Sequence, residues 1–132
     1  MKQILINLAV KDLQKSLAFY KALGFTAQFS DETIVRLVWS ESIAVMLMTR
    51  EKFRTFATKP LADAKSAMAG YFTLYVSGID ELNDIMTKGL NAGGTEPNEM
   101  SDHGFMQQRT IEDFDGHTWN FLFVDVSKLP VG

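Results

Sequence analysis

The chain contains no cysteine, which excludes disulfides, thiolate catalysis and cysteine-ligated metal sites and fits a reducing interior. It also has no apolar stretch close to the ~20 residues that a membrane-spanning helix needs. The apolar run within residues 1–12 is short, is interrupted by Asn7 and lacks a small-residue cleavage site, so no signal peptide is predicted. From these absences we expect a soluble, cytoplasmic protein.

A strong excess of charge is missing as well. The formal net charge is −3 over 132 residues, which gives no support to binding of nucleic acid or of a membrane surface. The sequence has no Gly-rich phosphate loop, nucleophile elbow or basic patch. What remains is an ordinary composition, with 46% hydrophobic and 22% charged residues, in a chain long enough to bury a core as one compact unit.

The chain repeats itself. Residues 4–25 and 71–94 each read as an alternating apolar strand that ends in valine, an acidic helix start, an amphipathic helix and a glycine stop. The matching positions are Val10 and Val76, Asp12 and Asp80, and Gly24 and Gly93–Gly94. Because a duplicated module fixes the architecture, we expect two copies across a pseudo-two-fold axis, with equivalent positions converging on one central cavity.

Hydrophobic alternation between turn residues predicts the strands. In the first copy they are residues 3–10, 25–30, 33–40 and 42–49, and in the second 71–76, 95–100, 104–112 and 117–125. Phe114-Asp115-Gly116 marks the last hairpin. Each copy therefore reads βαβββ. We expect an α+β fold in a single domain, 1–132, with modules at about 1–50 and 70–127 and a linker at 51–69.

Strand parity separates two faces in each module. One face is expected to pack against the helices, and it carries Ile4, Ile6, Leu8, Val10, Trp119, Phe121 and Phe123. The other is expected to line the cavity, and it carries Leu5, Asn7, Met46, Met48, Tyr71, Thr73, Tyr75 and Asn120. An apolar cavity with a few polar groups is typical of a small-molecule pocket. The same tyrosines and methionines are equally consistent with a cavity that they fill themselves.

Three separated segments resemble the vicinal-oxygen-chelate superfamily, which includes glyoxalase I, bleomycin-resistance proteins and extradiol dioxygenases. They are NLAVKDLQKSLAFYKALGF, the strand AVMLMT with the EKF that follows it, and HGFMQQRTIEDFDGHTW. The resemblance covers essentially the whole chain and is strongest to bacterial proteins labelled as predicted lactoylglutathione lyases. It implies paired βαβββ modules whose curled sheets surround a cavity, commonly assembled as a homodimer.

The resemblance also implies a divalent metal held by the first and last strands of each module, typically by two His, or His and Gln, and two Glu. The corresponding first-strand positions here are Leu5 and Tyr71, and the last-strand positions are Met46 or Met48 and Asn120. None is a His, Asp or Glu. Because such metals need anionic oxygen or imidazole donors, we expect no metal, no other cofactor and no catalytic residue.

Three further polar residues were weighed. His117 follows the Asp-Gly turn and is interpreted as a hairpin and packing residue. His103 lies in a Ser-Asp-His-Gly turn near the expected cavity mouth, and contact with a ligand is one interpretation because binding residues favour loops. Arg109 could clamp an anionic ligand, although pairing with Glu112 or Asp113 is the favoured interpretation. We add His103 and Arg109 to the candidate ligand-binding residues.

Three classes of function stay open. The preferred one is a metal-free homodimer that sequesters a small amphipathic or aromatic molecule, as the resemblance to bleomycin-resistance proteins implies. The second is a metal-dependent lyase of the lactoylglutathione lyase type, or a dioxygenase. The third is a degenerate member whose cavity is closed and whose role is structural or regulatory. The missing metal donors favour the first and third classes over the second.

Overall fold

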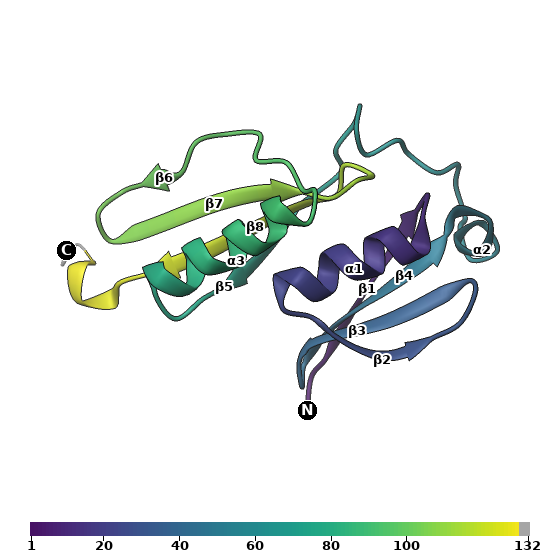
Figure 1. The fold of residues 1–132 in the computed structure, drawn as a ribbon, viewed down its shortest axis with the longest axis horizontal. Coiled ribbons are helices and arrows are strands. Elements are labelled where there is room, and N and C mark those ends of the chain that lie inside the picture. The colour runs from purple at the N-terminus through teal and green to yellow at the C-terminus, as the bar shows by residue number, and fades with distance from the viewer. Residues whose placement is uncertain (130–132) are drawn as a thin grey trace.

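The computed structural model describes residues 1–129, and its elements follow the repeat (Figure 1). The first half contains β1 (Ile4–Val10), α1 (Leu13–Leu23), β2 (Thr26–Ser30), β3 (Ile34–Ser40), β4 (Ile43–Thr49) and the short helix α2 (Arg50–Arg54). The second half contains β5 (Phe72–Tyr75), α3 (Ile79–Asn91), β6 (Ser101–Asp102), β7 (Met106–Glu112), β8 (Thr118–Val124) and a 3-10 turn at Val126–Lys128.

Each half forms one four-stranded mixed sheet, in the order β1-β4-β3-β2 and β5-β8-β7-β6. The first strand of each half pairs in parallel with the last, while the other pairings are antiparallel. The identical strand order confirms the predicted α+β fold with duplicated βαβββ topology. In Figure 1 the two sheets lie side by side. The helices α1 and α3 lie over the sheets and contact each other where the halves meet. No helix within residues 1–129 has the length and apolar character that crossing a membrane requires.

Local signals in the sequence set the ends of the first helix. The Asp12 carboxylate accepts a hydrogen bond from the Lys15 N–H at 3.0 Å, as an N-cap does. Gly24 ends the helix with φ of 122°, a conformation that other residues rarely adopt. The second helix begins one residue earlier than expected, at Ile79, with Gly78 as its N-cap and Asp80 in the first turn.

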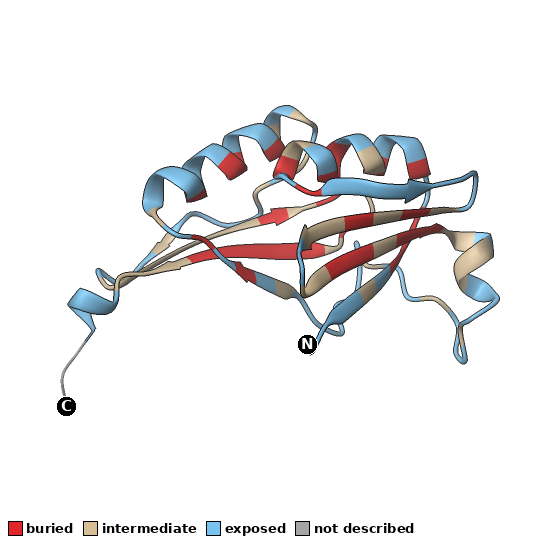
Figure 2. Cartoon of the chain, turned by 90° about the horizontal axis from the view of Figure 1, so that it is seen from below, coloured by how far each residue is buried: buried red, intermediate tan, exposed pale blue. Residues whose placement is uncertain are grey.

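The core lies between the helices and the faces of the sheets that were expected to meet them. Figure 2 shows the buried segments of both helices turned toward the strands beneath. Trp119, Phe121, Phe19, Leu23, Leu82 and Met86 are among the side chains that are almost wholly buried there. Burial of a side chain of this size contributes about 1.5–3 kcal/mol to stability. Trp119 and Phe121 are fully buried, as predicted for the helix-facing side, and Trp119 contacts Tyr20 of α1. Phe123 packs against the same core while remaining half-buried.

The outer edge of the second sheet differs from the prediction. The strand expected at 95–100 is reduced to a single bridge between Thr95 and Glu112, and β6 contains only two residues. Pro97 cannot donate to a ladder, and Glu96 turns inward to pair with Arg109. The strand expected from 104 begins at Met106, because Gly104 has φ of +81° and forms the turn before it.

A buried polar network joins the two halves. The Tyr20 hydroxyl on α1 donates to Asp113 Oδ2 at 2.6 Å, and Trp119 Nε1–H donates to the Tyr20 oxygen at 3.0 Å. Asp113 Oδ1 accepts the backbone N–H groups of Asp115 and His117 in the last hairpin. The Tyr20 hydroxyl, the Trp119 Nε1–H and both Asp113 carboxylate oxygens therefore have partners, which makes their burial favourable rather than costly.

Removal of the Tyr20 hydroxyl tests this network. The Tyr20→Phe variant leaves Asp113 Oδ2 and Trp119 Nε1–H without their partner, and we expect the free energy of unfolding to fall by about 1–3 kcal/mol. Urea denaturation provides the measurement. Tyr71→Phe, which changes a tyrosine that is 58% exposed, is the matched control. Equal stabilities of the two variants would contradict the assignment.

The same network predicts a dependence of stability on pH. Burial raises the pKa of the Asp113 carboxyl, against the opposing effects of His117 and of the hydrogen bonds it accepts. A raised pKa in the folded state means that folding favours the protonated acid, so this group adds stability as the pH falls through that pKa. We expect the free energy of unfolding of the wild type, relative to that of Asp113→Asn, to increase as the pH is lowered from about 7 to about 4. Urea denaturation at each pH provides the measurement. If the difference in free energy of unfolding between the two proteins did not change with pH, Asp113 would not be the group responsible.

Candidate functional site

The sheet faces that point away from α1 and α3 carry most of the residues that were expected to line the cavity. On the first sheet, Asn7 of β1 is aligned with Met46 of β4, and Met46 is aligned in turn with Arg36 of β3. Leu5 on the same face is 41% exposed, whereas Met48 is buried. This face therefore combines an apolar floor with two polar side chains, Asn7 and Arg36.

The second sheet presents the corresponding face. Thr73 of β5 is aligned with Asn120 of β8, which is aligned with Thr110 of β7. Asn120 is buried, and its Oδ1 accepts a hydrogen bond of 2.7 Å from the Thr110 hydroxyl. Tyr71 and Tyr75 are 58% and 71% exposed. We call these two uncovered sheet surfaces the open face; Figure 2 shows α1 and α3 together on the opposite side of the sheets.

Thr110 and Arg36 belong to this surface and were not predicted from the sequence. Each is the neighbour in sequence of a fully buried core residue: Ile111 follows Thr110, and Leu37 follows Arg36. Because neighbouring strand residues point to opposite faces, Thr110 and Arg36 must point away from the core. Strand parity was therefore a sufficient signal for finding them.

A cleft of about 700 Å³ lies where the two halves meet. Its walls come from β1, α2, the linker between α2 and β5, and the β7–β8 hairpin. Asn7 is the one predicted site residue among the lining residues found within 1–129. The linker residues could not be assigned to this cleft from the sequence, because their pattern does not indicate the path that the chain takes from α2 to β5.

His117 lies at this junction. Its Nε2 is 2.8 Å from the Ala9 carbonyl oxygen of β1, so Nε2 must carry the proton in this contact. Its backbone N–H donates to Asp113. The ring therefore links the two halves and also lines the cleft.

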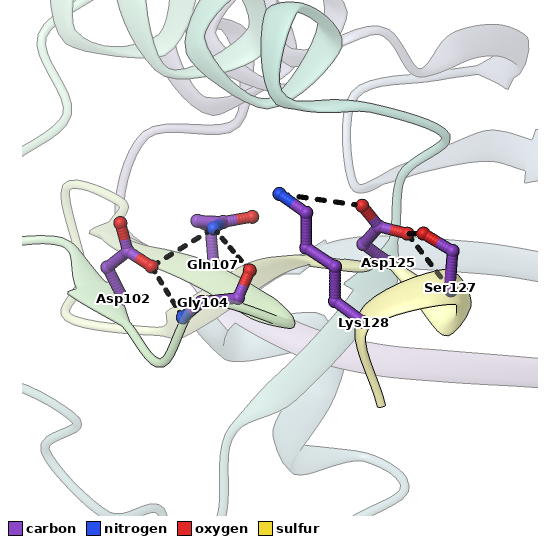
Figure 3. Close-up of polar contacts among 6 residues, drawn as sticks. All are labelled: Asp102, Gly104, Gln107, Asp125, Ser127 and Lys128. Atoms are coloured by element: carbon purple, nitrogen blue, oxygen red, sulfur yellow. Dashed lines mark hydrogen bonds and ion pairs between the residues drawn. The ribbon is translucent and has the colours of Figure 1, made fainter. Parts of the chain in front are cut away.

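His103 lies at the other end of the β7–β8 hairpin from the cleft. It is exposed, and its Nε2 is 3.0 Å from the Ser101 hydroxyl. Asp102 holds the turn by accepting the Gly104 N–H at 2.8 Å and the Gln107 amide at 3.0 Å (Figure 3). These hydrogen bonds, that of Gly104 first, lower the pKa of Asp102.

The turn packs beside the C-terminal part of the described chain. The backbone N–H of Asp125 donates to the Phe105 carbonyl at 2.7 Å. Lys128 Nζ lies 3.8 Å from Asp125 Oδ2, as Figure 3 shows. The polar side chains around His103 are thus used to shape a surface turn.

Arg109 does not lie where a cavity-lining residue was expected. It is aligned with the buried Phe121, so it occupies the helix-facing side of β7. Its guanidinium forms two hydrogen bonds with Glu96, at 2.8 and 2.9 Å, and one with Asn83 of α3 at 3.0 Å. The hydrogen bonds with Glu96 raise the pKa of Arg109. The favoured pairing with Glu112 or Asp113 was wrong, because the segment containing Glu96 folds back over this face.

The positions that would hold a metal do not fit one. Leu5 has no donor atom, Met46 and Met48 offer only thioethers, and the donor oxygen of Asn120 already accepts the Thr110 hydroxyl. A divalent ion of the zinc, nickel or manganese kind needs carboxylate or imidazole ligands. Within residues 1–129 no three His, Cys, Asp or Glu side chains are grouped closely enough to hold a metal ion.

Comparisons with known structures show where else this fold occurs. A hypothetical protein from S. aureus is 28% identical, with a TM-score of 0.79 over 93% of this chain and 94% of that one. A glyoxalase-related enzyme from Fulvimarina pelagi is 20% identical, with a TM-score of 0.81 over 100% and 94%. A genomically encoded fosfomycin resistance protein from Listeria monocytogenes is 14% identical, with a TM-score of 0.71 over 96% of each chain.

Comparison by sequence points the same way. No curated protein matches the chain. The model of the Glyoxalase/Bleomycin resistance protein/Dioxygenase superfamily matches residues 2–121, nearly the whole length. With its duplicated βαβββ topology and this match, the chain belongs to the Glyoxalase/Bleomycin resistance protein/Dioxygenase superfamily.

Proposed function

We propose that this protein binds a small amphipathic or aromatic molecule without a metal, in the manner of a bleomycin-resistance protein rather than of a lyase or dioxygenase. One observation carries the proposal: the chain matches the family over residues 2–121, while the positions that the resemblance assigns to metal ligands hold Leu5, Met46 or Met48, Tyr71 and Asn120. A scaffold of this kind keeps a concave surface for a ligand but has no Lewis acid to activate one.

The chemistry of the open face supports the choice of ligand. Tyr71 and Tyr75 present large aromatic surfaces to solvent, and each has a hydroxyl that can donate or accept one hydrogen bond. Asn7 is also exposed, with only a long 3.5 Å contact from its amide to the Leu5 carbonyl. A ligand with an apolar body and a few polar groups complements this combination.

The same exposure supports a homodimer. Large apolar side chains clustered on one face are uncommon on a monomer unless something covers them. Covering by a second copy would turn the open face into the wall of an enclosed cavity. We include the homodimer, and the cytoplasmic location expected from the sequence, in the proposal.

A closed, non-binding member of the family is the second candidate. Two observations favour it: Met48 is buried, and the Asn120 carbonyl oxygen is already paired with Thr110. In that case the side chains of the open face would fill the cavity of the dimer themselves. A metal-dependent lyase or dioxygenase receives no such support, because the donor set does not fit.

The absence of a metal is tested by metal analysis. We expect protein that has been equilibrated with Ni²⁺, Zn²⁺ or Fe²⁺ and then dialysed to retain far less than one ion per chain, since deprotonated ligands supply most of the affinity of a metal site. A variant with Leu5→His, Tyr71→His and Asn120→Glu restores the donor types and serves as the positive control. One ion per chain in the wild type, lost in Asn120→Ala, would establish a metal site and overturn the proposal.

Ligand binding is tested by a thermal-shift screen with aromatic and glycopeptide-like compounds. We expect at least one compound to raise the melting temperature, because a ligand that binds only the folded state stabilises it. Tyr71→Ala and Tyr75→Ala should weaken the shift, whereas Ile79→Ala, at the start of α3, should not. Sedimentation velocity on the same samples reports whether two chains associate and whether Tyr75→Asp separates them. A dimer that no compound stabilises would support the closed, non-binding member instead.

A further inference from the structure

We propose that the cleft between the two halves is a second ligand site, which adjoins the open face at Asn7, for an apolar molecule that carries one anionic group. The inference rests on the proposed function, in that it takes this protein to bind small molecules, and it names a different place and a ligand class. We call this cleft the linker cleft, since residues 56–70 of the linker form much of its wall.

The size and lining of the linker cleft are those of a small-molecule site. Its volume of about 700 Å³ lies inside the range of roughly 300–1,000 Å³ that is usual for ligand pockets. The larger apolar side chains of its lining come from α2, the linker and β5, and they are Phe53, Phe56, Leu61, Met68 and Phe72. Phe56 is 64% exposed and Met68 59% exposed, so apolar area remains at the rim that a ligand would remove from water.

The wall formed by the linker is held in place. The backbone of Ala64 and Lys65 lies directly on Gly116 of the β7–β8 hairpin, so closely that a Cβ atom on Gly116 would be 2.6 Å from it. Gly116 also has φ of +93°, which other residues rarely adopt. At the start of the linker, the Ala57 N–H donates to the Phe53 carbonyl at 3.1 Å. These contacts shape the cleft before any ligand arrives, which lowers the entropy cost of binding.

Charge sets the preference for an anion. The chain has a net charge of −3, yet the lining residues found within 1–129 include Lys59 and no Asp or Glu. A carboxylate or sulfonate at the rim would meet the lysine and no opposing carboxylate. The inner polar groups suit a neutral polar atom: Thr118 offers a hydroxyl, and a neutral His117 with its proton on Nε2 has Nδ1 as an acceptor.

Two fluorescent probes that differ by one charge test the site. 8-Anilinonaphthalene-1-sulfonate is flat, apolar and anionic, and N-phenyl-1-naphthylamine is its uncharged counterpart. We expect both to bind the folded protein saturably with one molecule per chain. Ala67→Trp, at an exposed position of the lining, should abolish this binding by filling the cleft, and Phe56→Ala should weaken it. Circular dichroism establishes that each variant is folded.

Lysine variants test the preference for charge. Lys59→Ala should weaken binding of the sulfonate about two- to fivefold, the size expected of an exposed charge pair, and should leave the uncharged probe unaffected. Lys59→Arg should restore the affinity. Lys65→Ala removes the same charge from the same linker at a position outside this cleft, and it is the matched control. Equal effects of Lys59→Ala and Lys65→Ala would overturn the assignment of the anion to Lys59.

The outcomes separate this inference from the proposed function. Binding that survives Tyr75→Ala and is lost in Ala67→Trp supports the linker cleft. Binding that is lost in Tyr75→Ala and survives Ala67→Trp places the ligand on the open face, which overturns this inference and leaves the proposed function standing. Binding that disappears as chains associate shows that a second copy occupies the cleft, and it also overturns the inference. Failure of both probes to bind saturably does so too, while the compound screen still decides the proposed function.

Discussion

The hydroxyl group of Tyr20 lies in a dry interior, where it must both donate and accept a hydrogen bond. It does so across the boundary between the two halves, by donating to Asp113 and accepting from Trp119. Each sheet has one long helix, α1 or α3, packed on its inner face, so the halves depend on this shared interior for much of their burial. One oxygen of the Asp113 carboxylate accepts from Tyr20 of α1 and the other from backbone N–H groups of its own hairpin, so the hairpin is fixed relative to α1. The position of His117 against Ala9, and with it the junction that forms the linker cleft, follows from the same constraint.

The open face shows that a duplicated scaffold can carry different residues at equivalent positions of its strands. The resemblance assigns metal ligands to Leu5, Met46 or Met48, Tyr71 and Asn120. The strand register aligns Leu5 with Ala44 and Thr73 with Asn120, and Tyr71 directly precedes β5. At Asn120, the hydrogen bond with Thr110 satisfies an oxygen that would otherwise need a metal or water.

Much of the fold could be predicted because its signals are local. The caps at Asp12 and Gly24, the Asp115-Gly116 turn and the alternation around Trp119 each depend on neighbours in sequence. The helix-facing and open faces followed from the same alternation.

The errors arose where distant segments decide the outcome. Arg109 was placed in the cavity because nothing local shows that Glu96 folds back to meet it. The segment 95–100 was predicted as a strand, but it contains Pro97, and Glu96 pairs with Arg109 instead; only Thr95 forms a bridge. The linker cleft was not foreseen at all, since its walls join residues that lie far apart in the chain.

The contact of the linker with Gly116 has a consequence for how the ligand preference of such a protein can evolve. The linker crosses from α2 to β5 and rests on the hairpin at one point, while neither sheet depends on it for strand pairing. Insertions or deletions between Thr58 and Ala62 would therefore change the size and polarity of the cleft and leave the core untouched. Selection for a new ligand can act on a short stretch of loop, much as it acts on the hypervariable loops of an antibody, without changing the residues that determine the fold.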